Sequence, residues 1–75
     1  MSHLHEDKKI LNRVRRLKGQ IHAVEASLTQ QEPSCIDVLQ QVAAIKGAVN
    51  GLMNELIEEH LREHVIKDPE AVNEQ

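Results

Sequence analysis

The fold is decided by residues 34–66, which read SCIDVLQQVAAIKGAVNGLMNELIEEHLREHVI. Apolar side chains recur in this stretch at spacings of four and three, at Val38, Val42, Ile45, Val49, Leu52 and Leu56. The spacing predicts one apolar seam on a long helix, with Ser34 as its N-cap and an end before Pro69. At 1.5 Å per residue such a helix is about 48 Å long, which is more than one short chain can cover.

A second apolar seam precedes this stretch and predicts a helix over residues 6–29. Its members are Ile10, Leu11, Val14, Leu17, Ile21, Val24 and Leu28. Glu6 and Asp7 are expected in its first turn, where carboxylates favour the helix dipole, and Pro33 closes the segment that ends it. The predicted class is therefore all-α, with two long antiparallel helices per chain that dimerise into a four-helix bundle.

Composition sets further limits on the chain. It has 75 residues, 40% of them hydrophobic, with one cysteine and no Phe, Tyr or Trp. So short a chain buries only about 60% of its unfolded surface. We therefore expect a second copy of the chain to cover apolar surface that one copy leaves exposed. One cysteine allows no intrachain disulfide, so we expect a free thiol in the reducing cytoplasm. Apolar runs of three or four residues predict no membrane span, and the N-terminus carries no secretion signal.

The net charge of −3 conceals an asymmetry. Residues 1–20 carry six of the nine Lys and Arg side chains but only two of the twelve acidic ones. This split indicates that the N-terminal part of the chain faces a polyanion and that the rest is acidic. The alternative is a solvated helix surface of mixed charge.

Three residues of the second helix carry metal-ligand chemistry. His60 and His64 are four apart, so their rings share one helix face and can converge on one ion. Two surface histidines at this spacing and an inert Cys35 are the alternative. Cys35 lies 25 residues before His60, about 37 Å along a helix, so the two can meet only between antiparallel copies. The N-terminus, with His3 and His5, could close over the same place.

Three segments in order resemble the CsoR/RcnR/FrmR family of small helical bacterial repressors. They are RVRRLKGQ at 13–20, Cys35 with VLQQVAAI at 38–45, and GAVNGLM at 47–53. The resemblance covers about residues 2–66. The family comprises copper, nickel/cobalt and formaldehyde sensors, which differ mainly at four sensing positions.

On this chain the sensing positions are His3, Cys35, His60 and His64, a set that resembles the nickel/cobalt-responsive RcnR type. The resemblance adds the α-amine of Ser2, freed by removal of Met1, and leaves His5 as a substitute for His3. It implies Ni(II) or Co(II) as the effector. Zn(II) would also bind, and Cu(I) fits less well because copper-sensing relatives carry a second cysteine at the position of His64. A formaldehyde sensor acting through Cys35 is the second interpretation.

The resemblance also implies a repressor that binds double-stranded operator DNA in its apo form and is released by metal, which derepresses metal efflux genes. A dimer of dimers, a homotetramer, would present basic helix faces to the DNA. The matching positions are Arg13, Arg16 and Lys46, and nonspecific phosphate contacts are expected from Lys8, Lys9, Arg15 and Lys18. Without aromatic residues to stack on bases, duplex targets are favoured over single strands.

Three expectations complete the interpretation. Residues 1–66 form the sensing and DNA-binding domain and residues 67–75 a polar tail, so the third helix usual in relatives is absent or truncated. His60 to His64 spells H-x-x-E-H, a metalloprotease signature with Glu63 as its acid, but a two-helix chain offers no substrate cleft and we expect no enzyme. A purely structural oligomerisation module would leave the His-Cys-His-His set unexplained.

Overall fold

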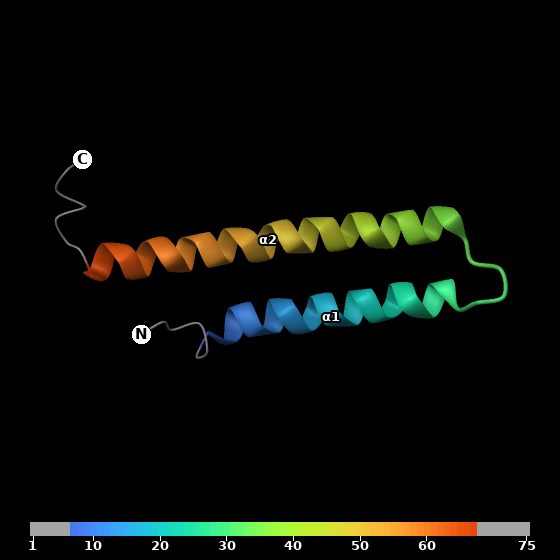
Figure 1. Cartoon of the computed structure of the whole chain (residues 1–75), viewed down its shortest axis with the longest axis horizontal. Helices are drawn as coiled ribbons and strands as arrows, with labels where there is room; N and C mark the ends of the chain where they lie inside the picture. Colours follow the sequence, from blue (N-terminus) through green and yellow to red (C-terminus); the bar gives the residue numbers. More distant parts are fainter. Residues whose placement is uncertain (1–6, 68–75) are drawn as a thin grey trace.

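Two antiparallel helices make up the fold. A computed structural model describes residues 7–67, in which α1 spans Lys8–Leu28 and α2 spans Cys35–Lys67. Figure 1 shows the helices side by side, joined at one end, with the start of α1 alongside the C-terminal half of α2. Within residues 7–67 there is no strand, so the predicted all-α class and the antiparallel pair are confirmed. The expected ligands Ser2 and His3, the alternative His5 and residues 68–75 of the expected tail lie outside the described part, whereas Lys67, the first residue of that tail, is the last residue of α2.

Local capping explains where both helices begin. Ser34 behaves as predicted, since its Oγ accepts a hydrogen bond from the Asp37 N–H at 3.3 Å and its carbonyl accepts from Val38 N–H at 3.0 Å. Asp7 was expected inside the first turn, which is wrong. It is the N-cap of α1, and its Oδ1 accepts from the N–H groups of Lys9 and Ile10 at 3.0 and 3.1 Å. The cap position is favoured over a position inside the first turn because the Asp7 carboxylate there accepts from two N–H groups that have no partner within the helix.

The single seam predicted on each helix divides into two columns. One column of α1 packs against α2 and contains the buried Ile10 and Leu17, 7% and 9% exposed, and the half-buried Val24. It meets the half-buried column of α2 formed by Val38, Ile45 and Leu52. Of the other predicted members, Leu56 is half-buried, and Leu11, Val14, Ile21, Leu28, Val42 and Val49 are exposed. Residues seven apart lie almost on one line, and a column displaced by four residues is turned by about 40°, away from the partner helix.

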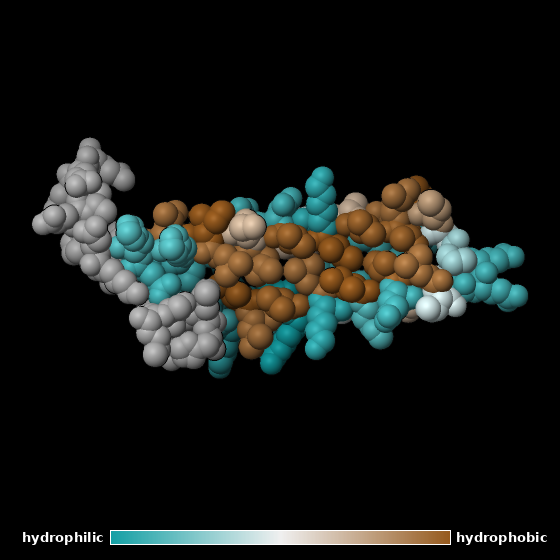
Figure 2. Space-filling view, in the orientation of Figure 1, coloured by the Kyte–Doolittle hydropathy of each residue, from teal (hydrophilic) through white to brown (hydrophobic). Residues whose placement is uncertain are grey.

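The exposed column widens into a continuous surface that we call the apolar face. It comprises Leu11, Val14, Ile21 and Leu28 of α1, and Leu39, Val42, Val49, Met53 and Ile57 of α2. Figure 2 shows hydrophobic side chains gathered along both helices on the side that faces the viewer. Within residues 7–67, neither helix is long and apolar enough to cross a membrane.

Candidate functional site

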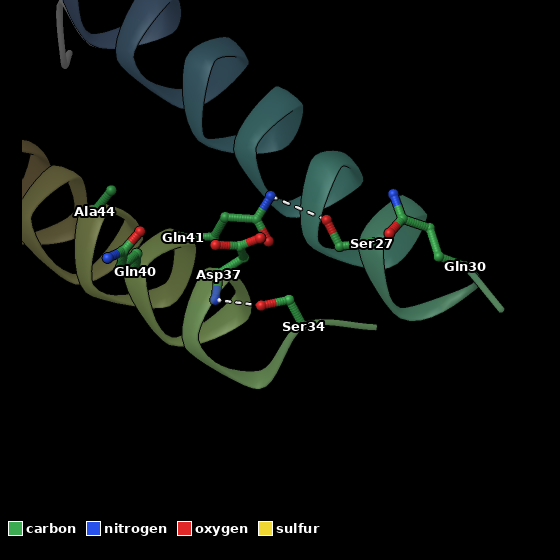
Figure 3. A pocket seen from close by; sticks show the side chains of 7 residues that line it. All are labelled: Ser27, Gln30, Ser34, Asp37, Gln40, Gln41 and Ala44. Carbon is green, nitrogen blue, oxygen red and sulfur yellow. Dashed lines mark hydrogen bonds between the residues drawn. The ribbon is translucent and has the colours of Figure 1, made fainter. Parts of the chain in front are cut away.

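Cys35 is the first residue of α2, and its side chain is exposed. Polar contacts hold this helix end in place. Beside the Ser34 cap, Gln41 Nε2 donates a hydrogen bond to Ser27 Oγ of α1 at 3.1 Å. Figure 3 shows both contacts in a polar pocket between the last turn of α1 and the first turns of α2. The thiol therefore projects from a fixed helix end and is accessible to a ligand.

His60 and His64 lie together near the other end of α2. Their ring centroids are 6.4 Å apart, their planes are inclined by 15°, and both residues are exposed. Imidazoles on successive turns of one helix face can turn toward a common ion. Glu63, between them in sequence, is instead half-buried, and its Oε1 is shielded from solvent. The acid of the H-x-x-E-H string is therefore turned toward the protein, whereas its two histidines are turned toward solvent.

The two ends of α2 present their ligands in the same direction. A helix turns by about 100° per residue, so Cys35, His60 and His64 all point within about 20° of Met53. Met53 belongs to the apolar face, which runs between the thiol and the imidazoles. Because Cys35 and His60 are about 37 Å apart along one helix, they cannot ligate the same ion within one chain.

The donor chemistry suits a borderline divalent metal. One thiolate and two imidazoles are ligands that Ni(II), Co(II) and Zn(II) accept. Among the described residues of a single chain, no three His, Cys, Asp or Glu side chains are grouped closely enough to hold a metal ion.

The expected DNA-contacting residues divide between several surfaces. Lys9 and Arg13 lie against α2, where Lys9 Nζ is 3.1 Å and Arg13 Nη2 is 3.5 Å from Glu55 Oε1. Arg13 and Arg16 also line a cleft between the helices, whose other walls are Gln20, Ala44 and Ala48. The structure therefore brings Lys9, Arg13 and Arg16 together on one side of the helix pair. We call this the basic cleft.

The remaining expected cations lie elsewhere. Lys8 and Lys18 are exposed, and Lys18 borders a shallow hollow on the outside of α1 with Arg15 and His22. Lys46 is exposed on the apolar face, turned by about 180° from Glu55 around α2. The structure does not bring Lys46 to the basic cleft within one chain.

Sequence reasoning missed Glu55 beside the basic cleft, and the structure adds a role for Gly51. A Cβ atom on Gly51 would lie 2.8 Å from Arg13 Nη1, so the guanidinium lies directly over this glycine. The signal available in the sequence was the hairpin register, since a turn at residues 29–34 places Lys9 opposite the region of Glu55.

Residues 6–75 match the sequence pattern of a family described as metal-sensitive transcriptional repressors. The chain belongs to this family. The resemblance to the CsoR/RcnR/FrmR family is thereby confirmed at the level of the family, whereas the nickel/cobalt type stays a prediction. The family is described as one of repressors that respond to metal, and what this chain itself binds and does is proposed below.

One curated relative of this chain comes from Serratia marcescens and is described only as an uncharacterized protein in the bioA 5′ region. It is 56% identical over 49 residues, which are 64% of this chain and 53% of the relative. The matched part thus spans about half the length of that protein.

Proposed function

We propose that this metal-sensitive repressor holds duplex operator DNA as an apo oligomer and releases it when Ni(II) or Co(II) binds, which derepresses metal efflux genes. The observation that carries the proposal is the placement of Cys35 and of the His60–His64 pair at opposite ends of one face of α2. Metal ligands at both ends of an uncovered apolar face indicate a site shared between two copies of the chain.

A second copy fits the apolar face. In the described chain Ile10 and Leu17 are the only buried hydrophobic residues, whereas eleven large hydrophobic side chains are exposed. Two α2 helices packed antiparallel about a two-fold axis near Val49 would cover this surface. The same symmetry sets Cys35 of one chain level with His60 and His64 of the other, at each end of the dimer. Pairing of two such dimers would give the homotetramer.

In this arrangement the ligands of one ion come from both chains. Cys35 from one chain and His60 and His64 from the other form the described part of each site, and the Ser2 amine and His3 would complete up to six ligands. Metal binding then ties two chains in one relative orientation. If that orientation binds DNA less tightly, metal lowers the affinity for DNA by some factor. DNA must then lower the affinity for metal by the same factor.

The basic cleft remains open in such a dimer. Lys9, Arg13 and Arg16 lie on α1 about 80 to 160° around the helix from Leu11, Val14 and Ile21 of the apolar face. They would contact phosphates of the duplex, joined by Lys8 and Lys18 from the outside of α1. Lys46 lies about 20° around α2 from Met53, so in this dimer it would face the partner chain and not the basic cleft.

An anaerobic titration with Co(II), followed by absorbance, tests the metal site. We expect a thiolate-to-cobalt charge-transfer band with weak d–d bands, saturating at about one Co(II) per chain. The charge-transfer band should vanish in Cys35→Ala, and saturation should be lost in His64→Leu. Intense d–d bands would favour tetrahedral Zn(II) instead. A missing thiolate band would contradict the metal proposal and favour formaldehyde acting on Cys35, which is exposed.

A second variant tests the DNA side separately. Arg16→Ala should weaken binding to duplex DNA because the guanidinium lines the basic cleft, but it should leave the Co(II) titration unchanged. Loss of metal binding in Arg16→Ala would contradict the separation of the two surfaces.

A further inference from the structure

Three charged side chains meet where the first turns of α1 pass α2. Lys9 Nζ and Arg13 Nη2 approach the same oxygen of Glu55, at 3.1 and 3.5 Å. The side chains differ in exposure: Lys9 is 69% exposed, Arg13 is 38% exposed and Glu55 is 18% exposed. The carboxylate therefore lies beneath the two cations, and the cations separate it from solvent.

Gly51 provides the space in which Arg13 lies. It precedes Glu55 by about one turn on the same side of α2, and an added Cβ would meet Arg13 Nη1 at 2.8 Å. Its φ is not positive, so the backbone does not require a glycine there. Gly47 differs, because a Cβ at that position would have nothing within 4 Å. The missing side chain at residue 51 thus allows the guanidinium to lie across the helix.

We propose that Glu55 is an internal competitor of DNA phosphate for Lys9 and Arg13 and so sets a ceiling on operator affinity. The inference rests on the proposed function, in which these two cations face the duplex. A phosphate that approaches them meets a potential already reduced by the carboxylate below. Binding then either breaks the contacts to Glu55 or leaves two negative groups sharing the same cations.

An orienting role for Glu55 is the opposing interpretation, and the geometry argues against it. Orientation of an arginine is strongest when two parallel N–H groups meet two carboxylate oxygens. Here a single oxygen serves both cations, and its contact to Arg13 is long at 3.5 Å. The next acid on this side of α2, Glu59, is paired with Arg62 at 2.9 Å. Glu55 is therefore the acid whose charge acts on the basic cleft.

Glu55→Gln, compared with Glu58→Gln, tests the competition. Both variants add one unit of charge on α2, but Glu58 is 67% exposed and lies 3.9 Å from Arg62, outside the basic cleft. The probe is a fluorescein-labelled duplex of mixed sequence, titrated by anisotropy from about 50 to about 200 mM salt. We expect Glu55→Gln to bind about three- to tenfold more tightly. Its slope of log affinity against log salt should steepen by about 0.9 for each extra phosphate contact. Glu58→Gln should stay near the unmutated protein in both measurements.

A matched glycine pair tests the same idea without changing charge. Gly51→Ala displaces Arg13 from its position over α2 and should steepen the salt slope, whereas Gly47→Ala should not. Alanine favours the helix more than glycine does, so both of these variants should fold. They therefore test the inference even if circular dichroism shows that Glu55→Gln is unstable. Weaker DNA binding by Glu55→Gln, or equal effects of Glu55→Gln and Glu58→Gln, would overturn the inference. No duplex binding by the unmutated protein would overturn the proposed function itself, and the inference with it.

Discussion

Mixed oligomers of two inactive variants would reveal whether the metal site is shared between chains. Cys35→Ala lacks the thiolate at every site and His64→Leu lacks one imidazole at every site. Within one chain Cys35 and His60 are about 37 Å apart, so an intrachain site cannot contain both. In a mixed dimer, one site combines the intact Cys35 of one chain with the intact His64 of the other, and the second site carries both defects.

Symmetry gives the size of the effect. Random pairing of equal amounts yields about half mixed dimers, each with one of its two sites intact, so about a quarter of all sites should return. The variants are unfolded together in urea, refolded, and titrated with Co(II) under anaerobic conditions. The signal is a thiolate charge-transfer band that saturates, which neither variant alone should give. Separately refolded variants, combined without exchange, are the control.

A converse mixture makes the test decisive. Unmutated protein refolded with the double variant Cys35→Ala/His64→Leu forms mixed dimers in which neither site is intact. The intact sites should therefore fall from about half of the total to about a quarter. No recovery in the first mixture together with no loss in the second would refute the shared site and leave each chain to bind metal alone.

Two further substitutions test the apolar face and the helix start. Met53 is 54% exposed in the single chain, but a two-fold partner would bury a charge placed there. Met53→Glu should therefore dissociate the oligomer in analytical ultracentrifugation and abolish the Co(II) band. Gln40→Glu, on the other side of α2, should do neither. Asp7→Ala removes cap bonds of 3.0 and 3.1 Å and should lower the free energy of unfolding by about 1 kcal/mol in urea titrations at fixed chain concentration, whereas the exposed Glu25→Ala should change it by less than about 0.5 kcal/mol. An unchanged unfolding midpoint in Asp7→Ala would contradict the capping role.

Helix positions could be predicted from the sequence because their signals are local. Ser34 and Pro33 lie next to the end they define, and the predicted bounds of both helices differ from the observed ones by two residues or fewer. The division of the apolar residues could not be predicted in this way. The columns through Leu17 and through Val14 are equally apolar, and only the direction of the partner helix decides which of them is buried.

The candidate metal ligands were predictable for a similar reason. The spacing of His60 and His64 sets their rings on neighbouring turns, and the structure places them 6.4 Å apart. The common direction of Cys35 and these histidines depends on something further, namely that α2 continues without a break through Gly47 and Gly51. A kink at either glycine would have rotated one end of the helix against the other, and the sequence left that possibility open.

The role assigned to Glu55 depends on the register between the helices, which no local pattern contains. Lys9 faces Glu55, Arg13 lies over Gly51, and Ser27 meets Gln41, so all three pairs follow from the turn at residues 29–34. One residue more in that turn would rotate the facing side of α2 by about 100° and shift it by about 1.5 Å. Glu55 would then leave the cations. The acid that limits DNA affinity is therefore chosen by the length of the loop, and not by the number of acids on α2.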